Sequence, residues 1–149
     1  METIVRARKT DLARNTRRII QAVQRGQTVI IEHHGQPEVA ILDIGDYRIL
    51  RALAYNFTNK PQVQRGSGLS HELVAAESTE QAQFNLVLAY YLADEISLAR
   101  TAEILGLTWL DLRSRFIRLD VPLRAAPSSQ SEARDDIESA AAWFEKEHT

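Results

Sequence analysis

A helix predicted between Thr10 and Gly26 is the feature that most constrains how this chain can fold. At about 100° per residue, its apolar side collects Leu12, Thr16, Ile19, Ile20 and Val23. The opposite side collects four arginines, Arg14, Arg17, Arg18 and Arg25. One side of this helix therefore has to pack on a core, and the other side carries only positive charge.

The ends of this helix are marked by residues that favour helix termini. The side chain of either Thr10 or Asp11 can accept a hydrogen bond from an amide of the first turn, so both are candidate N-caps. Gly26 tolerates the left-handed conformation that often ends a helix. The sequence thus predicts a helix that is bounded on both sides.

The flanking segments predict strands and a second helix. A short strand is expected over residues 2–7, and β-branched runs at residues 28–32 and 38–42 flank a turn at residues 33–37 that contains Gly and Pro. Asp43 or Asp46 can cap the following helix, which places on one face Tyr47, Leu50, Leu53 and Ala54. The predicted order is strand, helix, hairpin, helix, which is an α+β unit.

This order of elements and several short phrases resemble the Phd/YefM family of type II antitoxins. The phrases are residues 12–16 at the first helix, the closing Gly26, residues 34–37 in the hairpin turn and residues 43–47 at the second helix. The resemblance covers residues 1–56 and implies an obligate homodimer whose paired modules bind operator DNA. It marks as DNA contacts the basic residues Arg6, Arg8, Lys9, Arg14, Arg17, Arg18 and Arg25. An ordinary solvated arginine-rich face is the alternative interpretation.

Charge is distributed unevenly along the 149 residues, although the formal net charge is only −2. Residues 1–65 hold 11 Lys and Arg against 6 Asp and Glu, whereas residues 125–149 hold 2 against 6. Phosphate favours the first region and is repelled by the second, so two different partners are expected. The chain has no cysteine, no apolar signal core and no stretch of about 20 apolar residues. A cytoplasmic protein without a membrane anchor is therefore expected.

The second half of the chain predicts a small all-α unit. Residues 57–80 have the composition of a linker, and residues 81–124 predict three helices, at 81–94, 98–105 and 109–119. Ser97, Gly106 and Thr108 supply caps and a tight turn between the last two, as in a helix-turn-helix. Residues 90–124 also resemble a small uncharacterised prokaryotic helix-turn-helix family that accompanies PIN-domain nucleases in toxin–antitoxin pairs.

The last helix of this unit is the candidate recognition helix. Its helical wheel predicts a buried stripe made of Trp109, Leu112, Phe116 and Leu119. It leaves on the outside Asp111, Ser114, Arg115 and Arg118. Arg115 and Arg118 are thus further candidate DNA contacts. Because the segment is net acidic, a dimerisation or partner-docking bundle is the alternative interpretation.

Residues 125–149 form an acidic segment with a Ser-rich start. Apolar residues at helical spacing predict a short amphipathic helix that orders by packing on something else. The candidate partner-binding residues are Ile137, Glu138, Trp143, Phe144 and Glu145. Docking on the rest of its own chain is the alternative to folding on a partner.

Together these features predict an antitoxin that binds operator DNA as a dimer and neutralises a small RNase toxin of the PIN type. A stand-alone transcriptional regulator and an interaction adaptor without DNA binding are the alternatives. The sequence contains no nucleophile motif or zinc-helix spacing, so neither an enzyme, a cofactor nor a metal site is expected. His33 and His34 are adjacent in a predicted extended arm, so their side chains are expected on opposite faces.

Overall fold

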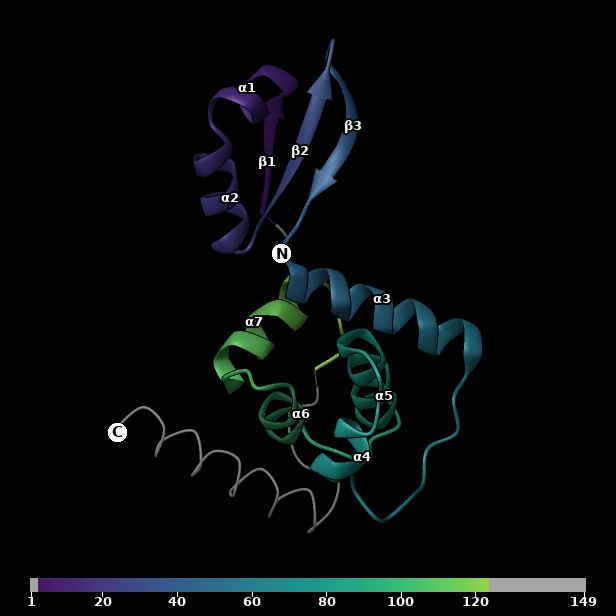
Figure 1. Ribbon diagram of the computed structural model, residues 1–149. Coiled ribbons are helices and arrows are strands. Elements are labelled where there is room, and N and C mark those ends of the chain that lie inside the picture. The colour runs from purple at the N-terminus through teal and green to yellow at the C-terminus, as the bar shows by residue number, and fades with distance from the viewer. Residues whose placement is uncertain (1–2, 124–149) are drawn as a thin grey trace, which may run out of the picture.

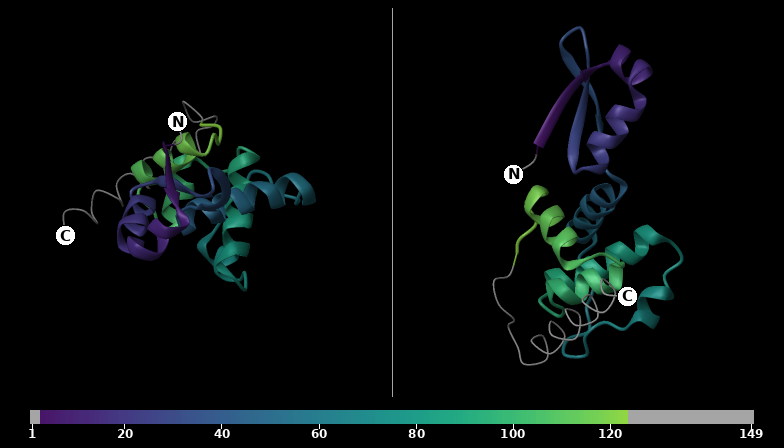
Figure 2. Two further views of the ribbon diagram at one scale, coloured as in Figure 1. Left: turned by 90° about the horizontal axis from the view of Figure 1, so that it is seen from above. Right: turned by 90° about the vertical axis from the view of Figure 1, so that its left-hand side faces the viewer.

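The computed structural model describes residues 3–123, and this range contains three strands and seven helices. The fold is therefore mixed α and β, as the sequence predicts. The elements form two lobes that meet at the start of helix α3 (Figure 1). One lobe, the N-terminal unit, contains the sheet with α1 and α2, and the other, the helical unit, contains α3 to α7. The right-hand view of Figure 2 shows the same two lobes from the side.

The N-terminal unit is a three-stranded sheet with two short helices. Its elements are β1 (Thr3–Arg8), α1 (Lys9–Arg14), α2 (Thr16–Gln24), β2 (Gln27–His33) and β3 (Gln36–Ile41). The strand order is β1-β2-β3, with β1 parallel to β2 and β2 antiparallel to β3. The helical crossover α1–α2 is what allows β1 and β2 to run parallel. Both predicted hairpin strands and the first strand are confirmed, with ends shifted by one or two residues.

The prediction of one continuous helix from Thr10 to Gly26 is wrong, because the helix breaks at Asn15. Asn15 has φ −125° and ψ 37°, which is outside the helical region. The break lets α1 contact both β1 and β2 while α2 packs on β2. The N-cap prediction is also wrong: helix α1 begins after Arg8, whose N–H donates to Oδ2 of Asp11 at 3.0 Å. Gly26, with φ +90°, does follow the end of α2 as predicted.

The hairpin turn consists of two residues in the left-handed region. His34 has φ +50° and Gly35 has φ +75°, the pattern of a type I′ turn, whose twist matches that of the flanking strands. Because His34 lies in the turn rather than in an extended strand, its ring lies only 4.0 Å from that of His33, centroid to centroid. The expectation that these two rings point to opposite faces is therefore wrong.

The core of the N-terminal unit is small. Its fully buried members are Ile19, Val23, Val29 and Ile31. Side chains alternate along β1 and β2, so Val5 and Ala7 lie on the face that α1 and α2 cover, and Ile4 and Arg6 lie on the other. That second face leaves Ile4 53% exposed. A unit of this size buries little apolar area by itself.

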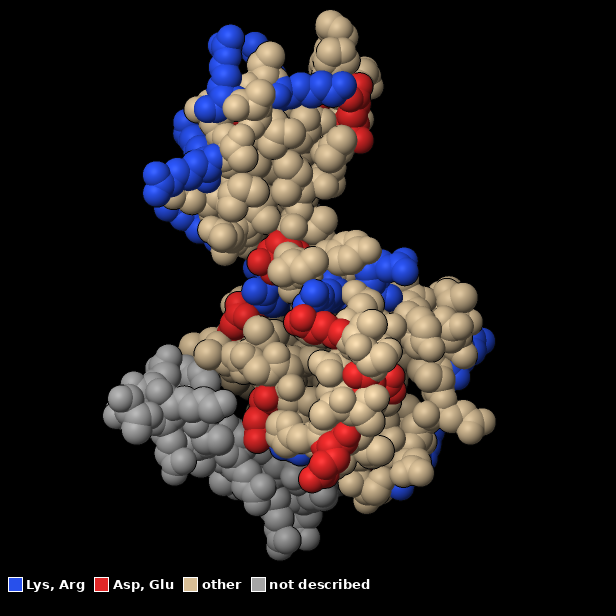
Figure 3. Space-filling model, in the orientation of Figure 1, with Lys and Arg blue, Asp and Glu red and all other residues tan. Residues whose placement is uncertain are grey.

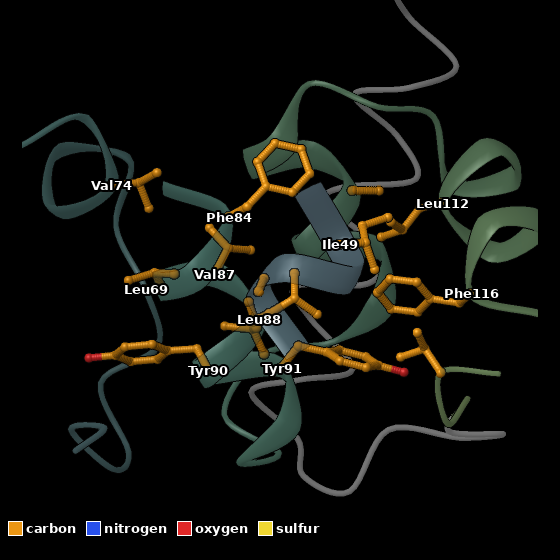
Figure 4. Packing of buried hydrophobic residues seen from close by; sticks show 14 residues of the cluster. Ile49, Leu69, Val74, Phe84, Val87, Leu88, Tyr90, Tyr91, Leu112 and Phe116 are labelled. Carbon is orange, nitrogen blue, oxygen red and sulfur yellow. The ribbon is translucent and has the colours of Figure 1, made fainter. Parts of the chain in front are cut away.

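The helical unit contains the larger core. Its elements are α3 (Ile44–Asn59), α4 (His71–Ala75), α5 (Glu80–Leu92), α6 (Leu98–Leu105) and α7 (Trp109–Arg118). Helix α5 is buried on several sides, as predicted. It supplies to the core Phe84, Val87, Leu88, Tyr90 and Tyr91. Figure 4 shows Tyr91 pointing toward Phe116 from α7, with Leu112 from α7 and Ile49 from α3 close by, while Tyr90 points to the opposite side of the core.

Helix α3 follows the N-terminal unit directly in the chain, but it packs in the helical unit. Asp43 caps it by accepting hydrogen bonds from the amides of Gly45 and Asp46, at 2.8 and 3.3 Å. Its buried face carries Asp46, Ile49 and Ala52, which pack towards α5 and α7. Tyr47 and Leu50, which the sequence predicts to share the apolar face of this helix, are instead 46% and 40% exposed.

The segment after α3 is partly helical and partly buried, although its composition predicts a linker. The predicted boundary at residue 56 falls inside α3, and residues 57–80 contain α4. Leu69 and Val74 from this segment are buried in the core of the helical unit. Among the helices at residues 3–123, none has both the length and the apolar content needed to cross a membrane.

Candidate nucleic-acid interface

The four arginines of the predicted basic face lie together on the helical side of the N-terminal unit. Arg14 ends α1, Arg17 and Arg18 lie in the first turn of α2, and Arg25 follows its last residue. All four are exposed, and within residues 3–123 none of their side chains forms an ion pair or a hydrogen bond. Figure 3 shows basic side chains gathered on this flank of the upper lobe. We call these four residues the basic face.

The position of Arg17 and Arg18 is electrostatically unfavourable for the helix itself. The N-terminus of a helix carries a partial positive charge, so each cation there destabilises the helix by about 0.3–1 kcal/mol. No acidic residue lies in the first turn of α2 to offset them. Helix stability therefore does not account for these two arginines, whereas an anion bound in front of α2 would be attracted by both the helix and the side chains.

The remaining basic residues of the N-terminal unit have different surroundings. Arg6 pairs with Glu32 across the sheet at 2.5 Å, and Lys9 pairs with Glu38 at 2.6 Å. The hydrogen bond from Lys9 holds the pKa of Glu38 below its usual value. Arg8 is exposed at the end of β1. Arg6 and Lys9 are thus partly neutralised by neighbours, in contrast to the basic face.

A cleft of about 510 Å³ lies between β1 and α2. It forms because α2 packs on β2, which leaves the inner face of β1 partly uncovered. The cleft floor is apolar and consists of Val5, Ala7, Ile19, Ala22 and Val29. The polar lining consists of Arg6, Asp11, Asn15, Arg18, Gln21, Arg25 and Gln27. The basic face therefore borders a partly apolar cleft on one side.

Arg115 and Arg118 do not extend the basic face, because both are ion-paired inside the protein. Arg118 donates to both carboxylate oxygens of Asp46, with nitrogen–oxygen distances of 2.8 to 3.0 Å. Arg115 donates to Asp46 at 2.8 Å and also to Asp43. The side chain of Asp46 is only 4% exposed, and those of the two arginines are 16% exposed. We call these four residues the aspartate–arginine joint.

The joint ties α7 to the start of α3, and the residue after α2 lies against it. A Cβ built on Gly26, directly after α2, would lie 2.6 Å from Nη1 of Arg118, and one on Gly45 would lie 2.7 Å from Nη1 of Arg115. The two glycines therefore let both guanidinium groups approach the backbone closely. The joint thus holds α7 against the start of α3, at the place where the end of α2 approaches both.

The joint also shifts the acidity of its members. Burial raises the pKa of Asp43, but the hydrogen bond and charge of Arg115 and the bonds from two backbone amides outweigh burial, so its pKa lies below the usual value. Burial lowers the pKa of Arg115, but Asp43, Asp111 and Asp46 outweigh this and raise it. Both groups are therefore held in their charged forms.

The predicted wheel of α7 is only partly correct. Leu112 and Phe116 are fully buried, as predicted, but Trp109 is 42% exposed. Arg115 and Arg118, predicted on the outside, turn inward because α7 packs beside the acidic start of α3. The outer surface of α7 instead exposes Trp109, Leu110 and Ile117, with the guanidinium of Arg113 5.9 Å above the Trp109 ring. Sequence reasoning missed this joint because its acidic and basic members are about 70 residues apart.

The partner-binding candidates Ile137, Glu138, Trp143, Phe144 and Glu145 lie outside the described residues. Within residues 3–123, no three His, Asp or Glu side chains are grouped so that they could hold a metal ion. Comparison of the chain with protein-family models, with curated proteins and with solved structures gives no match.

Proposed function

We propose that this protein is a DNA-binding antitoxin of a type II toxin–antitoxin pair. In this proposal it binds operator DNA through the basic face and neutralises a small RNase toxin through its C-terminal half. The resemblance of residues 1–56 to Phd/YefM antitoxins supports the proposal. The single observation that carries it is a set of four exposed arginines that have no side-chain partner within residues 3–123, Arg14, Arg17, Arg18 and Arg25.

Phosphate is the ligand that best explains this set. A duplex presents a regular row of negative charges, and arginines bind phosphate oxygens through two parallel hydrogen bonds. Arg8 lies at the neighbouring end of β1 and can extend the contact. Arg115 and Arg118 are left out of the proposed interface, because DNA would have to compete with buried carboxylates for them.

A homodimer completes the proposed interface. Among its described residues the N-terminal unit has four buried hydrophobic side chains, and it leaves Ile4 and Val39 more than half exposed. The strands β1 and β3 each have one edge without a partner strand among residues 3–123. A second copy can cover this surface, and it doubles the number of arginines that face the DNA.

The DNA proposal is tested by replacing both Arg14 and Arg18 with alanine in the full chain. A dimer of this variant lacks four phosphate contacts. The slope of log affinity against log salt concentration should therefore become less negative by about 3 to 4. Gel-shift or anisotropy titrations at several salt concentrations measure this slope. The matched control is Arg113→Ala, which removes an arginine on α7 and should leave the slope unchanged.

Light scattering should give the mass of a dimer for the wild type and for both variants. Equal affinity and equal slope in the double variant would contradict the DNA assignment. A folded monomer at micromolar concentration would contradict the dimer.

Toxin neutralisation is proposed for the acidic segment, which would occupy a positively charged RNA-binding cleft. Truncation after Ala126 removes this segment, and we expect the truncated chain to lose its protection of cells that express the neighbouring toxin gene. Growth with and without induction of both genes is the measurement. Full rescue by the truncated chain would instead assign neutralisation to the helical unit, whose outer surface exposes Trp109, Leu110 and Ile117.

A further inference from the structure

We propose that the cleft between β1 and α2 is the docking site for the acidic C-terminal segment of the same chain, residues 132–147. Docked there, the segment covers Arg18 and Arg25 and so competes with DNA. The docking itself does not depend on the proposed function, but its regulatory consequence does.

The shape of the cleft fits a peptide segment better than a small ion. Its volume of about 510 Å³ lies within the range of about 300–1,000 Å³ that is usual for ligand pockets. The floor consists of apolar side chains from β1 and α2, which are only partly covered at Val5, Ala7 and Ala22. A free phosphate would leave this floor in contact with water, whereas apolar side chains flanked by carboxylates would cover it.

The charges at the cleft select an acidic occupant. Arg18 and Arg25 line it without an ion pair among the described residues, and the only acidic residue in its lining is Asp11. Residues 132–147 supply six Asp and Glu against one Arg and one Lys, together with the apolar side chains Ile137, Trp143 and Phe144. Both the apolar floor and the basic rim thus have a complement in one segment of this chain.

The end of α7 lies close to the strand that borders the cleft. A Cβ built on Gly26 would lie 2.6 Å from Nη1 of Arg118, and Gly26 directly precedes Gln27, which lines the cleft. After α7 the chain packs on the helical unit, where the hydroxyl of Tyr91 donates to the carbonyl of Pro122 at 2.5 Å. The described residues end at Leu123, five positions after Arg118. Residues 124–131, which link Leu123 to the segment, can span about 26 Å when extended. A tether of this length gives an effective concentration on the order of millimolar, so even a weak contact is occupied within one chain.

The test uses the full chain with one spin label. The protein has no cysteine, so Ser139→Cys provides a single site for a nitroxide in a ¹⁵N-labelled sample. At low salt we expect paramagnetic broadening of the amide signals of Ala7, Ile19 and Ala22, and none at Thr101 in the helical unit. High salt should remove the broadening because it screens the ion pairs.

Two charge-reversed variants make the test specific. Replacing both Arg18 and Arg25 with glutamate should abolish the broadening. Replacing both Arg14 and Arg17 with glutamate should preserve it, because these two arginines do not line the cleft. Sharp cleft signals in the labelled wild type would overturn the proposal. Equal broadening in both variants would also overturn it. The same holds if broadening arises only between different molecules, that is, between a nitroxide-labelled copy and a ¹⁵N-labelled copy without the nitroxide.

The regulatory consequence is measured separately. Neutralising the segment by Asp135→Asn, Asp136→Asn and Glu138→Gln in the full chain should tighten DNA binding about tenfold at low salt, with a smaller gain at high salt. Unchanged affinity would refute competition with DNA. Broadening in a chain that does not bind DNA at all would refute the proposed function while establishing the docking.

Discussion

Replacing Asp46 with alanine is expected to destabilise the protein by about 4 kcal/mol, because it leaves two partly buried guanidinium groups without their main acceptor. Asp46 is 3% exposed and accepts hydrogen bonds from both Arg115 and Arg118. It also lies in the first turn of α3, where a negative charge is favourable. Equilibrium unfolding in urea, followed by circular dichroism, measures the free energy of unfolding.

The matched control for this prediction is Asp111→Ala. Asp111 also pairs with Arg115, at 3.1 Å, but its side chain is 44% exposed. A solvent-exposed pair of this kind contributes about 0–1 kcal/mol. If the two substitutions cost the same, the joint would be an ordinary surface ion pair and not a structural connection between α3 and α7.

Replacing Phe116 with alanine is expected to cost a similar amount, about 4 kcal/mol, by opening a cavity in the larger core. Phe116 is fully buried, and its ring lies 5.1 Å from that of Tyr91 at an angle of 53°. Tilted aromatic pairs at this distance are favourable beyond the area that they bury. Because Phe116 lies one residue from Arg115, the cavity would also loosen the joint.

Ile117→Ala is the control for the core prediction. Ile117 lies on the outer surface of α7 and is 39% exposed, so its truncation should cost less than about 1 kcal/mol. Thermal unfolding of the two variants beside the wild type compares the effects. A difference of less than about 1 kcal/mol between them would show that α7 is not a structural part of this core.

The sequence predicts the individual elements well where the signals are local. Ser97 and Thr108 cap α6 and α7 as predicted, accepting hydrogen bonds from the amides three residues ahead at 3.0 and 3.1 Å. Gly106, with φ +71°, ends α6. A cap, a tight turn and the hydrophobic periodicity of one helix each depend on residues within a few positions, so the sequence carries all the information needed.

The break at Asn15 shows where local signals become insufficient. The periodicity of residues 10–26 is that of a single helix, and it identifies Ile19 and Val23 correctly as buried. Whether the chain bends depends on the surface beneath it. Helix α1 contacts both β1 and β2, whereas α2 packs on β2. No pattern within residues 10–26 specifies that the chain has to change direction to cover both strands.

The order of strands and helices, the hairpin, the grouping of Arg14, Arg17, Arg18 and Arg25 and the buried character of α5 could all be predicted from the sequence. The packing of α3 with the helical unit could not, nor could the ion pairs of Arg115 and Arg118 with Asp43 and Asp46. The physical reason is the same in both cases. Periodicity shows which side of a helix is apolar or charged, but the partner of that side lies dozens of residues away and is chosen by packing and by the energetic requirement that buried charges be paired.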